Sequence, residues 1–150
     1  VHTRMEHDMR WMLIMNVEPE AARIAAETMD MAEMFAVMGA YNAEMQKAGV
    51  FLSAEGLSDP KEGFHVDFSS QPPAVTDGPF AESTEFFNGY WIIEVADRAE
   101  AVHWARKCPL GPGTSLEVRR INDLADFDLG ESGAGAEALA KEQEWRAANA

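Results

Sequence analysis

The chain has 150 residues, of which 47% are hydrophobic, and its 12 basic and 26 acidic residues give a formal net charge of −14. This length fits one domain with a substantial core, and the eight Phe and four Trp argue against a disordered chain. So acidic a surface repels phosphate backbones, which excludes nucleic acid as an expected partner. No apolar run reaches membrane-spanning length, so no membrane partner is expected either.

The single cysteine, Cys108, permits no internal disulfide, and we therefore expect a cytoplasmic protein. Residues 1–9 are expected to form an N-terminal tail without the apolar segment of a secretory signal. Residues 10–127 are expected to form the domain. Residues 128–150 are Gly-rich and then Ala- and Glu-rich, and we expect a polar tail that is able to form a helix.

The first third of the domain predicts a strand and a helix. Residues 10–16 are a short apolar run of strand length, and residues 17–30 are expected to be a connection with one helical turn. Asp30 begins a predicted helix over residues 31–48, and Gly49 ends it in a left-handed conformation. The apolar residues of this helix recur at spacings of three and four and so share one face: Met31, Met34, Phe35, Met38, Tyr41, Met45 and Ala48.

The rest of the domain predicts further strands, a hairpin and a second helix. Strands are expected at residues 50–55, 64–68, 90–95 and 115–121, on composition and alternation. Residues 69–89 carry three of the seven prolines and predict a long hairpin excursion. A second helix is expected over residues 99–108, capped by Asp97 and ended by Pro109.

The order of these elements predicts an α+β fold, the ferredoxin-like split βαβ arrangement with an inserted hairpin. Two helices cover one face of an antiparallel sheet in that arrangement, and the other face stays exposed. Since the strands carry apolar residues on both faces, we expect a homodimer whose sheets pack together.

Several segments carry a resemblance to a known family: "AGVFLSAEGL", "VTDGPFAES", "GYWIIEV", "ARKCP" and "LEVRRI". Together they resemble the DGPF-domain branch of the YCII-related family, from about Trp11 to Ile121, with the DGPFAE motif at residues 77–82. The resemblance implies a dimeric α+β barrel with a polar cleft near the sheet interface and no firmly assigned reaction.

The chain departs from the better studied YCII-like proteins, which pair a His on the first helix with an Asp just beyond the second strand. The predicted first helix, residues 31–48, contains no histidine. The His–Asp dyad cannot be carried over, and any chemistry would rest on carboxylates and Tyr.

The DGPF stretch has two interpretations. Asp77 can open an Asx turn by bonding the backbone two residues on, while Gly78 takes a positive φ and Pro79 stiffens the exit. Alternatively, the rigid turn holds the Asp77 carboxylate in a cleft as a general base. A turn does not require an aromatic side chain at Phe80, so this residue is expected to pack under the loop or to wall a pocket.

Other candidates accompany Asp77. Glu55 follows a strand and either assists catalysis or bonds loop amides. Arg119 either clamps a carboxylate substrate or pairs with Glu55, Glu82 or Glu94. Glu82 either binds substrate or contacts the amides of its own loop. Tyr41 is expected to pack in the core with its hydroxyl at a polar rim, where it would help to shape a pocket.

No cofactor or metal is expected. The chain has no GxGxxG, P-loop or nucleophile-elbow motif. His65 and Asp67 share a strand face, but no third metal ligand lies near them in the sequence.

Three functions follow as hypotheses. The first is a cofactor-independent enzyme of lyase, isomerase or hydrolase type, acting on a small polar molecule with Asp77 and Glu55 as acid/base groups. The second is a non-catalytic small-molecule-binding or regulatory module, for which the family resemblance implies a link to sigma-factor signalling. The third is a purely structural interaction protein.

Overall fold

The computed structural model describes residues 8–80 and 85–150. The chain divides into two units, Val1–Arg120 and Ile121–Ala150. The first unit contains the predicted sheet and its helices, and the second contains the C-terminal helix. Each unit is described by itself.

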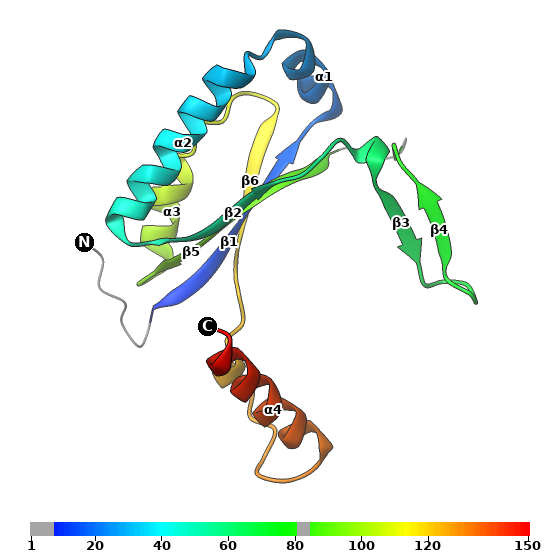
Figure 1. Ribbon diagram of the computed structural model, residues 1–150, viewed down its shortest axis with the longest axis vertical. Coiled ribbons are helices and arrows are strands. Elements are labelled where there is room, and N and C mark those ends of the chain that lie inside the picture. The colour runs from blue at the N-terminus through cyan, green and yellow to red at the C-terminus, as the bar shows by residue number, and fades with distance from the viewer. Residues whose placement is uncertain (1–7, 81–84) are drawn as a thin grey trace. The chain divides into compact units, whose positions relative to one another are not determined.

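A four-stranded antiparallel sheet forms the centre of the first unit (Figure 1). Its strands lie in the order β2-β5-β1-β6, and every neighbouring pair is antiparallel. The sheet is open at β2 and β6, so the single chain forms no closed barrel. The strands are β1 (Met9–Val17), β2 (Phe51–Gly56), β5 (Phe86–Val95) and β6 (Thr114–Arg120).

Helices α2 (Met31–Ala48) and α3 (Arg98–Arg106) lie on the same side of this sheet (Figure 1). Side chains from alternate strand positions meet them and form the core, because successive residues of a strand point to opposite faces. The mixed α+β class predicted from the sequence is confirmed. The buried core residues are Leu13, Tyr41, Met45, Val50, Trp91, Ile93, Val95, Ala101 and Trp104.

The predicted apolar face of α2 only partly reaches the core. Met38, Tyr41 and Met45 pack there, whereas Met31 is 62% and Phe35 69% exposed. The predicted face therefore belongs to the core only from Met38 onward, and Met31 and Phe35 in the first turns are exposed. Residues at helical spacing share a face, but only the turns that have sheet opposite them bury it.

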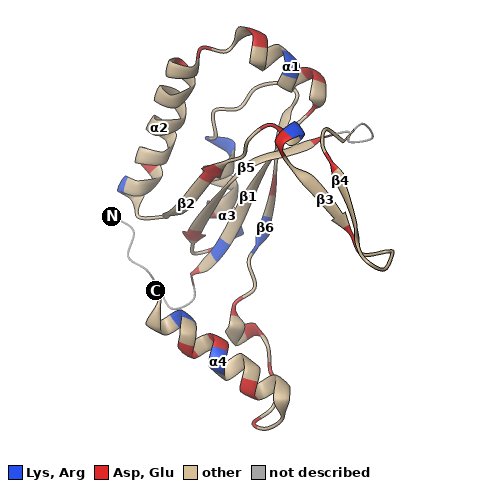
Figure 2. Ribbon diagram, turned by 45° about the vertical axis from the view of Figure 1, so that its right-hand side comes forward, with Lys and Arg blue, Asp and Glu red and all other residues tan. Residues whose placement is uncertain are grey.

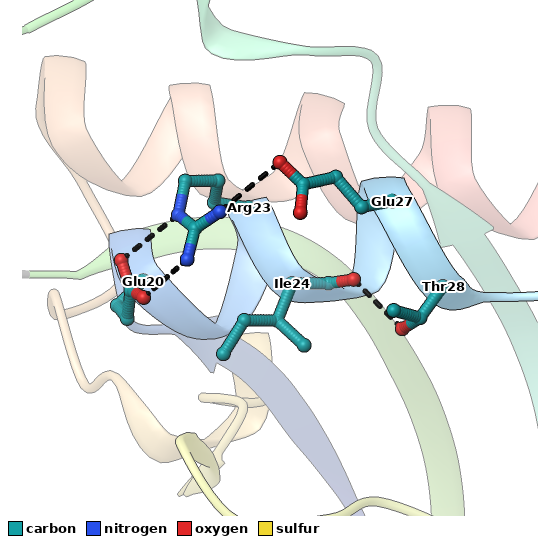
Figure 3. Close-up of polar contacts among 5 residues, drawn as sticks. All are labelled: Glu20, Arg23, Ile24, Glu27 and Thr28. Atoms are coloured by element: carbon teal, nitrogen blue, oxygen red, sulfur yellow. Dashed lines mark hydrogen bonds and ion pairs between the residues drawn. The ribbon is translucent and has the colours of Figure 1, made fainter.

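Helix α1 (Pro19–Thr28) replaces the single helical turn expected before α2. Pro19 occupies the first turn, where its missing N–H costs nothing. Arg23 then bonds Glu20 one turn earlier, with 2.6 Å from Nη2 to Oε1, and Glu27 one turn later, with 3.0 Å from Nη1 to Oε1 (Figure 3). The helix buries no residue, so local bonds and its four alanines, rather than tertiary packing, explain it.

The predicted caps of α2 and α3 are present. The Asp30 carboxylate accepts hydrogen bonds from the amides of Ala32 and Glu33, and Gly49 ends α2 with φ 77°. The Asp97 carboxylate accepts from the amide of Glu100 at 2.9 Å. These residues satisfy helix-end groups that have no partner within the helix.

Strands β3 (Phe64–Asp67) and β4 (Ala74–Asp77) form a separate two-stranded antiparallel sheet, the inserted hairpin. The short 3₁₀ turn η1 (Pro60–Glu62) precedes it. At its base, the Gly78 amide donates to the Gly63 carbonyl at 2.9 Å.

The second unit contains the 3₁₀ turn η2 (Leu124–Asp126) and helix α4 (Ala134–Ala148). No residue of α4 is buried. An exposed ion pair between Arg146 and Glu142, with 2.9 Å from Nε to Oε1, spans one helical turn.

Candidate functional site

The sheet face opposite α2 and α3 is the first candidate site, here named the open face. Leu13, Trp91 and Ile93 point to the helices, so the residues between them point away. The strand register aligns these into two rows across the sheet. The rows are Ser53, Ile92, Met12 and Arg119, and next to it Glu55, Tyr90, Ile14 and Glu117.

The open face has an apolar centre. Met12 and Ile14 of β1 and Tyr90 and Ile92 of β5 are half-buried in the single chain. They lie on the two central strands and form one continuous patch. Such a patch in a sheet commonly marks an interaction surface.

Charges at the open face are divided between the two halves of the sheet. Strand β2 carries the exposed Glu55, whereas Glu94 of β5 is buried and lies opposite Arg10 of β1 in the register. Strand β6 carries Arg119 beside Glu117, with 4.0 Å from Nη1 to Oε2. Figure 2 shows the blue segments on β1 and β6. Among these residues, the exposed charges are therefore Glu55 at the β2 edge and the Glu117–Arg119 pair at the β6 edge.

Glu55 and Arg119 are both on the open face but at opposite edges of the sheet. Three strand spacings separate β2 from β6, which amounts to about 14 Å. An ion pair between them within one chain is therefore excluded, and Arg119, 73% exposed, instead lies near Glu117. Glu55 is exposed and lies opposite Tyr90 within β2, not beyond the end of the strand.

The structure corrects the turn geometry predicted for Asp77 and Gly78. An Asx turn from Asp77 would need the amide of Pro79, and proline has no N–H. Asp77 is the exposed last residue of β4, and its carboxylate makes no hydrogen bond with residues 8–80 or 85–150.

Gly78 does not have the positive φ expected of it. A glycine is needed because a Cβ there would lie 2.9 Å from the carbonyl carbon of Pro60, with the carbonyl oxygen closer still. The motif glycine therefore serves the close approach of two backbone segments.

Phe80 packs on His65 of β3. The two rings are parallel, with centroids 3.5 Å apart and planes 4° apart. This contact accounts for the aromatic residue directly after the turn. It agrees with the first of the two roles predicted for Phe80, packing under its own loop. A role for Phe80 in walling a ligand pocket stays a prediction.

The hairpin has a second, apolar face that is exposed. Phe64, Val66 and Val75 share this face with Asp77, because cross-strand partners point to the same side. Phe64 is 61% and Val75 64% exposed. A lone two-stranded hairpin is marginally stable in water, so this face is suited to a contact with another surface.

Tyr41 is a core residue. Its hydroxyl donates to the Trp104 carbonyl at 2.8 Å, and its ring meets Trp91 edge to face at 5.7 Å. Burial raises the pKa of Tyr41, and the nearby Cys108 thiol contributes to the same shift. The predicted core packing is confirmed, and the hydroxyl has a backbone partner. A role for Tyr41 in shaping a pocket stays a prediction.

Cys108 neighbours the Tyr41 hydroxyl at the end of α3. Burial raises the pKa of its thiol to about 12, and the hydrogen bond with Tyr41 offsets part of that shift. A thiol in this state is protonated at neutral pH and is a poor nucleophile, which agrees with the structural role expected of it.

The predicted site residues do not form one cluster in a single chain. Glu55 and Arg119 lie at opposite edges of the open face, Asp77 and Phe80 belong to the hairpin, and Tyr41 lies on the helix side. Glu82 lies outside the described residues.

Sequence reasoning missed a cavity of about 300 Å³ between α3 and β6, here named the α3–β6 groove. Arg106, Cys108, Thr114 and Leu116 are among the residues that line it. The available signal was that the apolar stripe of α3 and the Leu116–Val118 side of β6 face each other, with a Gly- and Pro-rich loop between them.

The YCII-related domain matches residues 9–125, which includes the whole four-stranded sheet and the hairpin. The chain belongs to the YCII-related domain family. No curated protein gives a significant match. Assignment of this YCII-related protein to the DGPF branch stays a prediction.

This YCII-related domain shows neither a membrane-spanning helix nor a metal-binding cluster among its described residues. Within residues 8–80 and 85–150, no helix combines the length and apolar character needed to cross a bilayer. In the same ranges, no three His, Cys, Asp or Glu side chains are grouped to hold a metal ion.

Proposed function

We propose that this YCII-related protein acts as a homodimer that binds a small polar molecule in a cleft completed between two protomers. The observation that supports it is the open face, whose apolar centre of Met12, Ile14, Tyr90 and Ile92 has charged residues at both edges. In this proposal the fold is the ferredoxin-like split βαβ arrangement, and two sheets form a dimeric α+β barrel.

Charge complementarity favours one dimer geometry. A two-fold axis parallel to the strands places β2 of one protomer over β6 of the other. The β2 edge of each face, which carries Glu55, then meets the β6 edge of its partner, which carries Arg119. Glu55 comes within one row of Arg119 of the partner subunit, so two residues that a single chain keeps apart would meet at each end of the interface.

The dimer is tested by sedimentation with matched variants. Ile14→Glu introduces a charge into the apolar centre and is expected to weaken dimerisation at least about 100-fold, since an unpaired charge would be buried. Ile24→Glu on α1, at a side chain 47% exposed, is the control and is expected to leave the dimer intact. A wild-type chain that stays monomeric at micromolar concentration would refute the proposal.

The two-fold axis is tested by charge exchange. Glu55→Arg and Arg119→Glu are each expected to weaken the dimer about 2- to 30-fold, because surface pairs contribute roughly 0.2–1 kcal/mol and symmetry repeats each pair. The double variant is expected to recover most of the loss. Additive weakening in the double variant would exclude this axis.

Ligand binding is tested by a thermal-shift screen of small polar metabolites on the full chain. A ligand at 100 times its dissociation constant stabilises the fold by about 2.7 kcal/mol. Glu55→Gln and Arg119→Gln are expected to remove the shift, while Glu62→Gln on η1 preserves it. A hit that survives both cleft variants would place the ligand elsewhere.

An enzymatic role is a second candidate, and the position of Asp77 favours it. Its carboxylate ends β4 on the hairpin face that carries Phe64 and Val75, so a docking partner would enclose it in apolar surroundings suited to acid/base chemistry. In this case Asp77→Asn and Glu55→Gln abolish turnover of the identified ligand. Turnover that is unchanged in both variants removes this role.

A cytoplasmic location belongs to the same proposal and rests on the single cysteine.

A further inference from the structure

The α3–β6 groove lies on the helix side of the sheet, away from the open face. Leu116 and Val118 of β6 pack toward the core, and α3 and the loop after it close the other side. The groove is therefore distinct from the proposed dimer cleft. Its apolar lining consists of Val102, Ala105, Cys108, Leu110, Leu116 and Val118.

Arg106 is the one charged side chain among the described residues that line the groove. It is exposed and makes no ion pair or hydrogen bond with another described residue, although the chain has 26 acidic residues. Its neighbour Lys107, by contrast, pairs with Glu44 and lies 5.3 Å from the ring centre of Trp104. The guanidinium of Arg106 is thus available to an anionic group at the mouth of the groove.

Two residues with hydroxyl groups, Thr114 and Ser115, are among those that line the groove. Thr114 donates its hydroxyl proton to the Gly111 carbonyl, so only its lone pairs are available. Ser115 points to the open face, because it alternates with Thr114 and Leu116 and shares a side with Glu117 and Arg119, so its hydroxyl does not enter the groove. The Arg106 guanidinium is therefore the donor that the groove offers, and its two parallel N–H groups suit the two oxygens of a carboxylate.

The size of the groove limits the ligand. A water molecule occupies roughly 30 Å³ of liquid, so 300 Å³ accommodates on the order of ten non-hydrogen atoms. This volume is at the lower end of small-molecule sites, which are mostly apolar with a few polar groups that fix orientation. The lining of the groove has that character.

We propose that the α3–β6 groove binds an aliphatic monocarboxylate of about ten non-hydrogen atoms. Its hydrocarbon chain lies against the apolar lining, and its carboxylate lies on the Arg106 guanidinium, which donates to both oxygens.

Octanoate and octanamide provide the test, because each has ten non-hydrogen atoms and only octanoate is charged at pH 7. Titration of the full chain, followed by calorimetry and by amide chemical shifts, is expected to show octanoate binding at least about tenfold more tightly than octanamide. The shifts are expected to be concentrated at α3, β6 and the loop between them. Equal affinities, or no octanoate binding, would overturn the proposal.

Two arginine variants separate the site from general charge effects. Arg106→Gln is expected to remove the preference for octanoate, whereas Arg98→Gln, on the same helix but not lining the groove, retains it. Both arginines are exposed, so neither change threatens folding. Loss of the preference in both variants, or in neither, contradicts the assignment.

Cys108 supplies an independent readout, since it is the only thiol in the chain and lines the groove. Saturating octanoate is expected to slow its alkylation at pH 9, and octanamide at the same concentration to slow it much less. Alkylation that octanoate leaves unchanged would show that the ligand binds outside the groove.

Discussion

Gly78→Ala tests the reason that the structure gives for the glycine of the DGPF motif. A Cβ at this position would lie 2.9 Å from the carbonyl carbon of Pro60 and 3.2 Å from Cζ of Phe80. Ordinary carbon–carbon contacts are about 3.5–4.0 Å, so the two backbone segments must separate by at least about 0.6 Å. That movement strains the hydrogen bond from the Gly78 amide to the Gly63 carbonyl.

The expected cost follows from the rigidity of what is displaced. Both groups are backbone, and the Pro60 segment cannot rotate away as a long side chain would. Overpacking of this kind costs about 1–3 kcal/mol. Because the hairpin is a separate two-stranded sheet, the loss is expected in its local opening rather than in the unfolding of the whole chain.

Amide hydrogen exchange measures this loss directly. A decrease of 1–3 kcal/mol in the opening free energy corresponds to about 5- to 150-fold faster exchange at Gly78 and at the amides of β3 and β4. Amides of β1 and β5 are expected to keep their wild-type rates. Gly39→Ala is the matched control, because nothing lies within 4 Å of its Cβ. Unchanged exchange in the hairpin of Gly78→Ala would refute the close-approach argument.

The remaining predictions concern the core and the helices. Tyr41→Phe is expected to lower the free energy of unfolding by about 0.5–1.5 kcal/mol, because it removes the bond to the Trp104 carbonyl; an unchanged denaturation midpoint would contradict this. Gly39→Ala is expected to raise the same free energy by about 0.5–1 kcal/mol, since alanine is the better helix former, and thermal unfolding checks it. Asp97→Ala removes the cap of α3 and is expected to cost about 1 kcal/mol, with Asp97→Asn close to wild type. Burial raises the pKa of Cys108 from 9.0 to about 12, so the unfolded chain ionises first and stability is expected to fall between pH 9 and 12; Cys108→Ala is expected to flatten that fall in denaturant titrations.

Local patterns accounted for much of the fold. Alternation and composition located all four strands of the main sheet, because a strand with one face on a core needs apolar residues at every second position. Asp30, Gly49 and Asp97 marked helix ends, since capping depends on groups within a few residues. Helix α1 is longer than the single turn predicted for residues 17–30, because Pro19 occupies the first turn, where helices accept proline.

Local sequence patterns predicted less of the candidate site than of the fold. Asp77 and Gly78 were assigned by turn chemistry, but what decides Gly78 is the Pro60 backbone, which lies 18 positions earlier in the chain. The sequence indicates that Phe80 has a role beyond the turn, because a turn requires no aromatic residue there. Its partner His65 follows only from the hairpin geometry. Alternation places Arg119 on a face of its strand, and Glu55 is one of its three predicted partners, but strand order puts the two residues at opposite edges of the sheet.

The sequence by itself determined the class of fold, the caps, and the residues that mark the YCII-related family, because these depend on short-range periodicity and on residue identity. The tertiary structure decided which residues meet. It placed Glu55 and Arg119 at opposite edges of one face, buried Tyr41 behind the sheet, and opposed α3 to β6 around the groove. Strand order, register and helix placement arise from contacts between segments far apart in the chain, and no local pattern encodes those contacts.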